Sequence, residues 1–435
     1  MTDERIAVIG AGWAGLAAAV SLAERGMPVA VFEASRSLGG RARRVTIDGV
    51  DLDNGQHILI GACRETLRMM RLAGADPEAL LLRMPLELRN ADGFRLRATR
   101  FPYPFNLLLA LLGAKGLSFA QALRAARFVA ALRAHNFRVE PDRSVAQLLK
   151  EHRQAGTLRI HLWEPLCVSA LNTPANRASA QVFARVLRDS LTGFRENSDL
   201  LLARTDLGRL FPEPAAEYVR AHGGAIELGV PVRAIARDGE GFRLDDRPAR
   251  YSAVIVACAP QHAAALLSAF PELAATRAAI DALEYEPIVT CYLQYPESVS
   301  LPANMLGLSG GIVQWVFDRG RLSGRSGENA GLLAAVISAS GAHEDLPKEN
   351  LVSRIEAELA WALGPLPEPL WSRVITEKRA TFSCTPALKR PEGVTPVSGL
   401  LLAGDYVASE YPGTIEAAVR SGIAAANQVP TDVRY

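Results

Sequence analysis

The chain has 435 residues, of which 49% are hydrophobic and 22% charged, a composition typical of a globular protein with a sizeable core. Its 48 basic and 46 acidic side chains give a formal charge of +2, which argues against a nucleic-acid partner. The five cysteines and seven histidines are scattered, without spacing that suits a disulfide framework or a metal site, so we expect no bound metal.

The N-terminal segment indicates where the protein resides. It is acidic before its first apolar run and does not resemble a signal peptide. No apolar run approaches the roughly 18–20 residues of a transmembrane helix, and 105–114 is about half that length. An odd number of cysteines fits a reducing compartment. We therefore expect a cytoplasmic protein that is at most peripheral on the inner face of the membrane.

Residues 5–34 predict a strand, a glycine-rich turn, a helix and a second strand. The expected strands are Arg5–Ile9 and Val29–Phe32, and the expected helix is Ala14–Arg25. The turn, GAGWAG, has the G-x-G-x-x-G spacing. Alone this spacing is weak evidence, but between a strand and a helix it is typical of a dinucleotide-binding unit.

Each glycine of this turn has its own expected role. Gly10 allows the tight turn, Gly12 lets a pyrophosphate approach the backbone, and Gly15 lets helix and strand pack closely. The phosphates would lie at the helix N-terminus, beside Ala14. Glu33 stands 18 residues after Gly15, where a carboxylate binds ribose hydroxyls and repels the 2′-phosphate of NADP. The alternative is a turn with a purely structural role.

The next two segments favour FAD over NAD. SLGGRARR (37–44) places a glycine pair and Arg41 just after the second strand, where they suit a pyrophosphate. VDLDNGQHILIG (50–61) is a strand broken at Gly55, which would bring residues 55–57 near a flavin ring. With these motifs the chain resembles the amine-oxidase and phytoene-desaturase superfamily of FAD enzymes. The resemblance implies an α/β fold, with a Rossmann-type, glutathione-reductase-like FAD-binding domain and an interleaved α+β substrate domain.

The same resemblance implies a discontinuous domain organisation. The FAD-binding domain would comprise 1–84, 205–267 and 391–435, and the substrate domain 85–204 and 268–390. The first substrate block reads as helical. The second alternates strand-like runs with an expected helix, Glu349–Leu363. In the β-rich stretch between the blocks, the resemblance places the backbone of Val232 at the adenine end of FAD.

Residues 93–139 have an unusual local charge. They contain eight basic side chains and no Asp or Glu, together with the apolar run 105–114. Basic residues mixed with Leu, Phe and Tyr suit an anionic membrane surface. The alternative is a buried helical pair with solvated arginines.

Near the C-terminus an apolar run, 399–403, stops at Gly404-Asp405, and Gly413 opens an expected helix. In the superfamily, Asp405 would bond the ribityl or pyrophosphate part of FAD, and the helix N-terminus would face the flavin pyrimidine. The alternative is an ordinary junction with an exposed aspartate. The expected FAD contacts are Gly10, Gly12, Ala14, Gly15, Glu33, Ala34, Gly40, Arg41, Gly55, Gln56, His57, Val232, Gly404, Asp405, Thr414 and Ile415.

Two positions argue against an amine oxidase. Thr414 stands where those enzymes place a tyrosine that boxes the amine, and Thr290 stands where their flavin-side lysine is expected. The chain is more similar to the bacterial hydroxysqualene dehydroxylases. The segments that carry this similarity are 51–63, 162–191, 314–321, 380–391 and 400–422.

The resemblance implies reductive removal of the allylic hydroxyl of hydroxysqualene to give squalene, a precursor in hopanoid or sterol synthesis. Protonation and loss of water would leave a delocalised carbocation, which a hydride from reduced flavin quenches. The substrate is a long-chain triterpene, and the electron donor is not identified. The alternatives are a carotenoid- or phytoene-type desaturase, a flavin amine oxidase, or a non-enzymatic prenyl-binding escort protein, against which the intact FAD motifs argue.

Four side chains are candidates for the chemistry. Trp315 and Phe317, at i and i+2 of a strand, could place π-electron density beside a cation, although core packing is the alternative. His57 titrates near neutral pH when unperturbed, so it is one candidate proton donor. Glu164, flanked by Trp163, is the other, provided that burial raises its pKa. For Glu164 the alternative is an ion pair with an arginine, and for His57 a role in shaping the flavin pocket.

Overall fold

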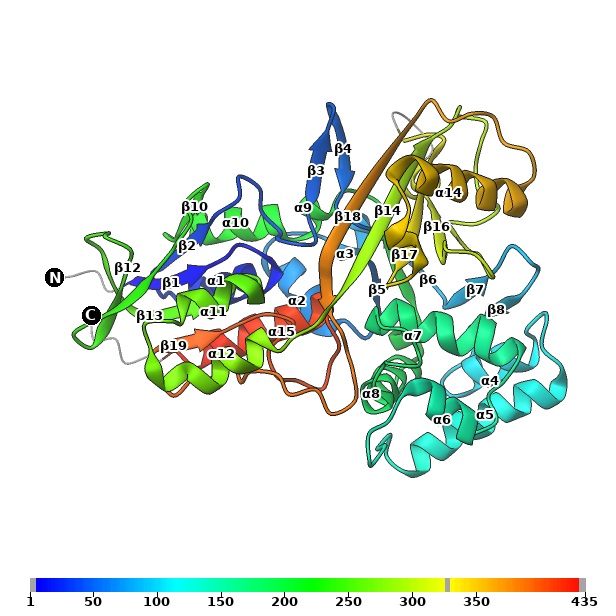
Figure 1. The fold of residues 1–435 in the computed structure, drawn as a ribbon, viewed down its shortest axis with the longest axis horizontal. Coiled ribbons are helices and arrows are strands. Elements are labelled where there is room, and N and C mark those ends of the chain that lie inside the picture. Colours follow the sequence, from blue (N-terminus) through cyan, green and yellow to red (C-terminus); the bar gives the residue numbers. More distant parts are fainter. Residues whose placement is uncertain (1–4, 325–328, 430–435) are drawn as a thin grey trace.

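The computed structural model describes residues 5–324 and 329–429 and contains two main sheets with helices around them (Figure 1). The first sheet has the order β10-β2-β1-β13-β12-β11. Strand β12 pairs with residues 250 and 251 of β13, and β19 pairs with residues 254–256 of the same strand. Strands β10, β2, β1, β13 and β19 are parallel, whereas β12 and β11 are antiparallel. The bounds are β1 Arg5–Ile9, β2 Val29–Glu33, β10 Ala225–Leu228, β11 Ile235–Asp238, β12 Gly241–Leu244, β13 Arg250–Val256 and β19 Leu400–Leu402.

Both faces of this sheet are buried, as its continuous apolar strands require. Ile6 and Val8 point to one face, where they join a core with α1, α10 and α15, whereas Ala7 and Ile9 point to the face of α11 and α12. These helices are α1 Trp13–Glu24, α10 Pro212–Ala221, α11 Pro260–Leu266, α12 Ala274–Asp281 and α15 Ile415–Asn427. The α/β expectation is confirmed, and the elements expected in residues 5–34 lie within one residue of their predicted ends.

The two ends of the described chain meet where α15 packs on α1. A Cβ added at Gly422 would lie 2.1 Å from the carbonyl oxygen of Ala14, so only glycine allows the helices to approach this closely. The last helix is therefore locked onto the first one. The glycine turn and the Gly404-Asp405 junction consequently belong to one rigid unit.

The second sheet is antiparallel, in the order β15-β16-β17-β14-β18. Its strands are β14 Tyr285–Gln294, β15 Met305–Gly307, β16 Trp315–Asp318, β17 Leu332–Ser338 and β18 Trp371–Phe382. Helix α14 (Lys348–Leu363), which confirms the expected helix, packs against one face. The long strands β14 and β18 extend toward the first sheet (Figure 1).

A helical block lies beside the second sheet, as expected for the first substrate segment (Figure 1). Its helices are α4 Phe105–Leu112, α5 Phe119–Ala134, α6 Val145–Glu151, α7 Glu164–Leu171 and α8 Ala180–Leu191, with a π-helical turn, Arg159–Trp163, before α7. The remaining helices are α2 Arg64–Leu72, α3 Pro77–Leu80, α9 Leu207–Leu210 and α13 Arg319–Ser323, with 3₁₀ turns at Arg195–Ser198, Pro271–Leu273 and Ala342–Asp345.

Small sheets connect these parts. Hairpin β3–β4 comprises Arg44–Ile47 and Val50–Asp53, and hairpin β7–β8 comprises Glu87–Arg89 and Arg95–Arg97. A three-stranded sheet has the order β5-β9-β6, and its strands are β5 Ile58–Ile60, β9 Leu200–Ala203 and β6 Leu81–Met84. Strand β9 falls in the predicted substrate segment, yet both of its partners fall in the predicted FAD-binding segment. The two units thus share this sheet instead of meeting at a single hinge.

Three structural features bear on the expectations from composition. No described helix is long and apolar enough to span a bilayer. Within the same residues, no group of three or more His, Cys, Asp or Glu side chains is placed to hold a metal ion. All five cysteines are free thiols.

Candidate functional site

The glycine turn between β1 and α1 shows which glycines the fold itself requires. Gly10 has a φ of +108°, and a Cβ there would lie 2.8 Å from the backbone of Ala257. A Cβ on Gly15 would lie 1.9 Å from the carbonyl oxygen of Gly10. At Gly12, in contrast, φ is −76°, and an added Cβ would meet only the Cα of Gly40, at 3.8 Å. Packing therefore does not explain Gly12, whereas close approach of a ligand does.

The N-terminus of α1 is suited to an anion. Its N-cap is Gly12, no side chain caps it, and its first turn contains no acidic residue. A helix N-terminus in this state presents free N–H groups and a positive dipole end. Gly39 closes the cradle from the other side, because its N–H donates to the carbonyl oxygen of Ala11 at 2.9 Å. Together the two glycine loops leave an open, uncapped helix N-terminus of the kind that suits a pyrophosphate.

Glu33, at the end of β2, is held beside this turn. Its carboxylate accepts hydrogen bonds from the N–H of Ala11 (2.7 Å) and of Ser35 (2.8 Å). The chain returns to the same place after β10, where the N–H of Val230 donates to the carbonyl oxygen of Glu33 at 2.9 Å. Val232 follows, half-buried, and within the described ranges its backbone groups have no hydrogen-bond partner. The segment that carries Val232 is thus tied to Glu33 two residues earlier, at Val230.

The Gly404-Asp405 junction is tied to the SLGGRARR segment. Asp405 is buried, and its Oδ1 accepts a hydrogen bond from Nη2 of Arg41 at 2.5 Å. Nη1 of Arg41 donates to the carbonyl oxygen of Ala380, at the end of β18, at 2.8 Å. The alternative of an exposed aspartate is therefore wrong. Residues about 360 positions apart meet here in one ion pair, of which the Asp405 side chain is buried and the Arg41 side chain half-buried.

Helix α15 begins at this junction and is fixed at its first turn. The hydroxyl of Thr414 accepts a hydrogen bond from the N–H of Ala417 at 3.2 Å, as an N-cap. The buried carboxylate of Glu416 accepts from the Thr66 N–H at 2.9 Å and from the Thr66 hydroxyl at 2.7 Å. A Cβ on Gly413 would lie 3.2 Å from Oδ2 of Asp405. The helix N-terminus and Asp405 therefore share one small site.

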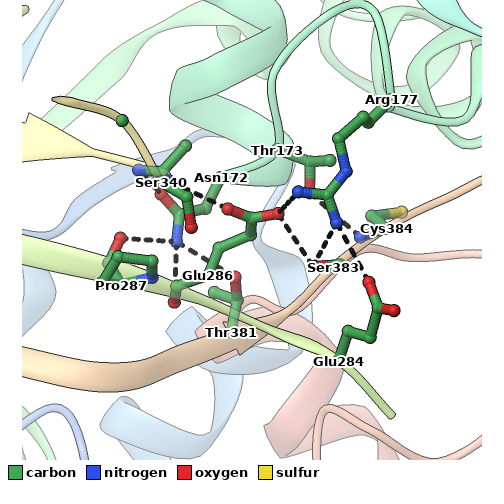
Figure 2. A network of polar contacts seen from close by, with 12 residues as sticks. Asn172, Thr173, Arg177, Glu284, Glu286, Pro287, Ser340, Thr381, Ser383 and Cys384 are labelled. Atoms are coloured by element: carbon green, nitrogen blue, oxygen red, sulfur yellow. Dashed lines mark hydrogen bonds and ion pairs between the residues drawn. The ribbon is translucent and has the colours of Figure 1, made fainter. Parts of the chain in front are cut away.

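A buried polar network holds the end of β18 in place (Figure 2). Nδ2 of Asn172, just after α7, donates to the hydroxyl of Thr381 at 3.1 Å. Glu286 is fully buried, accepts a hydrogen bond from the Ser383 hydroxyl at 2.8 Å, and pairs with Arg177 at 3.2 Å. Its bonds satisfy a charge that would be costly to bury alone. The network fixes the strand end that contacts Arg41 and Gly413.

Helix α8 anchors the loop that precedes α15. The hydroxyl of Tyr411 donates to Oδ2 of Asp189 at 2.8 Å, and Arg185 forms an ion pair with Glu410. Burial, followed by the nearby Asp189 carboxylate, raises the pKa of Tyr411 to about 12. Three of the segments that resemble hydroxysqualene dehydroxylases, 162–191, 380–391 and 400–422, thus meet at the Asp405 and Thr414 junction.

The face of the second sheet that is directed away from α14 carries the predicted substrate residues. Trp315 and Phe317 are buried on this face, whereas Val316 between them packs in the core with α14. Across the strands, Trp315 lies opposite Val336, and Val336 lies opposite Thr290. Residues directly opposite one another in a sheet have side chains on the same face. Trp315 and Thr290 therefore belong to one row.

Thr290 is the polar residue of that row. Its Oγ1 is buried and has no hydrogen-bond partner among the described residues. A Cβ added at Gly55 would lie 3.8 Å from this oxygen and 3.8 Å from Nε2 of His57. Gln56 between them donates to the Tyr292 hydroxyl at 2.7 Å. The glycine-broken strand and β14 thus bring two polar atoms to one place.

The structure corrects both premises for a proton donor. Burial, and secondarily the charge of Arg41, lowers the pKa of His57 to about 4, so the imidazole is neutral at pH 7 and the expectation of near-neutral titration is wrong. Glu164 is not enclosed, since 31% of its side chain is exposed, and it pairs with Nε of Arg159 at 2.7 Å. The ion pair that the sequence left open is the observed arrangement.

The sequence analysis did not predict a buried ion pair beside residues 55–57, the segment expected near the flavin ring. Asp53, at the end of β4, is 3.7 Å from Arg319 on α13, and burial raises the pKa of Asp53 to about 6 despite that partner. The Tyr292 hydroxyl donates to the Asp53 carbonyl oxygen at 2.8 Å. Both charged residues lie in segments that carry the family resemblance, 51–63 and 314–321. Strand alternation gave no reason to expect the aspartate to be buried.

The remaining predicted contacts lie around the same cradle. Ala14 and Ile415 are the second and first residues of α1 and α15, Ala34 is exposed beside Glu33, and Gly404 has a φ of +155°. Next to it, the hydroxyl of buried Tyr406 has no hydrogen-bond partner in the described part of the chain. An open glycine cradle, an uncapped helix N-terminus and orphaned buried hydroxyls fit a bound FAD.

Comparison with known proteins agrees with this site. The family model described as flavin containing amine oxidoreductase matches residues 13–430. The chain is 30% identical to a hydroxysqualene dehydroxylase of Rhodopseudomonas palustris, over 98% of both chains, and 28% identical to one of Zymomonas mobilis, over 97% of both. An oxidoreductase structure from Methanosarcina mazei has a TM-score of 0.72 and 19% identity, over 97% of this chain and 100% of that chain. The protein therefore belongs to the family of flavin-containing amine oxidoreductases and is a FAD-dependent oxidoreductase.

Proposed function

We propose that this enzyme removes the allylic hydroxyl of hydroxysqualene to give squalene. The relatives named hydroxysqualene dehydroxylase match the chain over nearly its whole length, which supports this choice of substrate. The single observation that carries the proposal is the row of side chains that contains Thr290. Within this largely apolar row stands a hydroxyl without a partner among the described residues, at the position where the resemblance to amine oxidases leads us to expect a lysine.

The apolar row suits a substrate that passes through a carbocation. It comprises Trp315, Val336, Thr290 and Ile375, directly opposite one another on four strands. Strands lie about 4.8 Å apart, so Trp315 is on the order of 10 Å from Thr290. None of the four carries a charge or a strong nucleophile that would trap a cation. The aromatic ring stabilises positive charge through its π face.

The residues that would hold FAD are those of the cradle described above. The N-terminus of α1 and Gly12 take the pyrophosphate, Glu33 the ribose, and Asp405 with Arg41 the ribityl side. When bound in its reduced form, FAD supplies the hydride that replaces the hydroxyl. The chain contributes orientation and a dry site, because the row and the core around it are buried.

The hydroxyl leaves as water, so it must take up one proton, supplied by solvent, at the same place. In our proposal the Thr290 hydroxyl and Nε2 of His57 bond the substrate hydroxyl and hold it for departure. Because His57 is neutral at pH 7, it acts as a hydrogen-bonding group and not as a stored acid. Glu164 takes no part, since it is paired at the surface. A hydrogen bond to the leaving oxygen stabilises the transition state as the carbon–oxygen bond breaks.

The test is product analysis under anaerobic conditions. FAD-loaded enzyme is chemically reduced and mixed with detergent-dispersed hydroxysqualene, and the extract is analysed by mass spectrometry. We expect squalene from the reduced enzyme and none from the oxidised enzyme. Conversion by the oxidised enzyme into products that have lost two hydrogens would instead identify a desaturase. Purification without flavin, even after incubation with FAD, would favour the escort protein.

A further inference from the structure

Helix α4 has an unusual orientation for a helix of a globular protein. Phe105, Leu108, Leu109 and Leu112, at i, i+3, i+4 and i+7, are exposed to solvent, and Phe105 is 57% exposed. The opposite side, with Asn106 and Ala110, is buried. An apolar stripe at helical spacing normally faces the core. In α4 it faces outward.

Neighbouring segments enlarge this surface. Phe101, before α4, is 58% exposed, and Phe119, at the start of α5, is 72% exposed. Leu123, one turn further along α5, is exposed as well. Contiguous exposed apolar side chains are uncommon on monomeric proteins and mark interaction sites. We refer to Phe101, Phe105, Leu108, Leu109, Leu112, Phe119 and Leu123 as the apolar face.

Unpaired positive charge accompanies the apolar face. Arg100, Lys115, Arg124 and Arg127 are exposed, and among the described residues none of them has an ion-pair partner. No Asp or Glu occurs between residues 93 and 139. Carboxylates that would neutralise these cations are thus absent from the segment itself.

A cavity of about 250 Å³ lies beside Lys115, which follows α4, and is lined in part by basic side chains. Its lining includes Arg89 and Lys115 as well as Arg95, which pairs with Glu87 at 2.8 Å, and no Asp or Glu belongs to the lining itself. Such a cavity suits a phosphate-bearing headgroup, because each cation is a hydrogen-bond donor to phosphate. Lys115 belongs to both features, so the cavity and the unpaired cations are continuous.

We propose that the apolar face lies in the surface of an anionic lipid membrane, with the four exposed cations at the headgroups. The pattern of exposed Phe and Leu with flanking Lys and Arg is that of an interfacial helix, which lies in the plane of the membrane instead of crossing it. A protein partner would leave the one-signed charge unexplained, unless it were itself acidic. The alternative of a buried helical pair is wrong for α4, since its apolar stripe is exposed.

The use of this contact rests on the proposed function. Hydroxysqualene is a long-chain triterpene alcohol that partitions into lipid, so a membrane contact brings the enzyme to its substrate. Ala110, on the buried side of α4, and Ala114, just after α4, belong to the same hydrophobic core as Trp315 and Phe317. The apolar interior therefore continues from the membrane face to the proposed substrate row.

The experiment is vesicle co-sedimentation of the FAD-loaded protein. Vesicles of phosphatidylcholine alone and with phosphatidylglycerol are compared at low and high salt. We expect binding to the anionic vesicles that weakens as salt rises, because each cation contributes about fivefold and is screened. The paired change Lys115→Ala with Arg124→Ala should reduce affinity by about 25-fold. Phe105→Glu with Leu112→Glu should reduce it by at least about tenfold.

Leu370→Glu is the matched control, because Leu370 is 70% exposed but lies in the loop before β18 and does not belong to the apolar face. This variant should bind like the wild type. Equal loss in Leu370→Glu, or equal binding to neutral and anionic vesicles, overturns the proposal. If the wild type is a dimer that does not bind vesicles, and the Phe105→Glu and Leu112→Glu variant is a monomer, the proposal is overturned and the apolar face belongs to a contact with a second copy.

Activity separates this proposal from the proposed function. With detergent-dispersed substrate, the Phe105→Glu and Leu112→Glu variant should retain FAD and its turnover, because both side chains are exposed. With substrate in anionic vesicles it should be slower than the wild type by about tenfold. Vesicle binding by a wild type that does not convert hydroxysqualene would refute only the proposed function.

Discussion

Thr290→Val tests whether the orphaned hydroxyl exists for function. Valine has nearly the shape of threonine, and the neighbours of Thr290 across the sheet are Val336 and Ile375. The side chain is fully buried, and its Oγ1 has no partner among the described residues. Removal of the hydroxyl should therefore stabilise the fold and slow the reaction, which is the opposite of what an ordinary buried hydrogen bond would give.

The size of the effect follows from the penalty for an unsatisfied buried polar group, about 1–3 kcal/mol. At roughly 2.1 cal/mol/K per residue, 435 residues give an unfolding entropy of about 0.9 kcal/mol/K. The melting temperature should thus rise by about 1–3 °C. Loss of a neutral hydrogen bond of about 0.5–1.5 kcal/mol to the leaving oxygen should reduce the rate by about three- to tenfold.

The assay compares melting of the FAD-loaded variants and their single-turnover rates with hydroxysqualene. Thr395→Val is the control, because the Thr395 hydroxyl is buried but donates to the Leu400 carbonyl oxygen at 2.7 Å. That variant should melt lower than the wild type. Thr290→Ser, which keeps the hydroxyl, should keep the rate. A lower melting temperature for Thr290→Val, together with an unchanged rate, would refute the reasoning.

Four further predictions concern the cradle and the candidate acids. Gly12→Ala should fold but lose FAD, whereas Gly15→Ala should fail to fold, because its Cβ would lie 1.9 Å from a carbonyl oxygen. Circular dichroism reports the folding of each variant, and flavin absorbance reports bound FAD. An unfolded Gly12→Ala variant would contradict the prediction. Glu33→Ala should bind FAD about ten- to hundredfold more weakly, and stoichiometric flavin after dialysis would refute its role. Glu164→Gln should keep its single-turnover rate within about threefold, and a loss of 10²-fold or more would restore it as the acid. Burial lowers the pKa of His57 in the folded protein to about 4, so the protein should lose up to about 3 kcal/mol of stability as the pH falls from about 6.5 to 4. His57→Asn should weaken the dependence of the melting temperature on pH over that range. The same pH dependence in the variant and the wild type would contradict the shift.

The cofactor motifs can be recognised in the sequence because their constraints are local. Gly10 has a φ of +108°, and a Cβ on Gly15 would lie 1.9 Å from the carbonyl oxygen of Gly10, so these two requirements act within the turn and the motif is visible in the chain. Gly12 and Glu33 follow at fixed spacing from the same unit. The ion pair between Arg41 and Asp405 has no such local signature, because only the fold brings the two segments together.

The catalytic half was predicted less well because it depends on burial. Glu164 follows Trp163, which is buried, but the helix directs the carboxylate to Arg159 instead. Asp53 is buried and Asp51 exposed on the same strand, a difference that arises from Arg319 far along the chain. Exposure and pKa are properties of the packed structure, and a strand pattern does not contain them.

The segment that we propose to face a membrane lies between these cases. Composition predicted the contact, since positive charge without carboxylates is read directly from 93–139. The direction of the apolar stripe was open, because a helix rich in leucine on all sides has no single face in sequence. Packing of Ala110 against the core turns Phe105 and its neighbours outward.

The central claim is that reduced FAD and this chain convert hydroxysqualene into squalene, and one measurement tests it most directly. A single anaerobic turnover is run in D₂O, where the transferable hydrogen of reduced flavin exchanges with solvent and carbon-bound hydrogens do not. The account predicts squalene with one deuterium, at the carbon that carried the hydroxyl, and one flavin oxidised per squalene formed. Squalene without carbon-bound deuterium, or oxidation of the flavin without squalene, would contradict it.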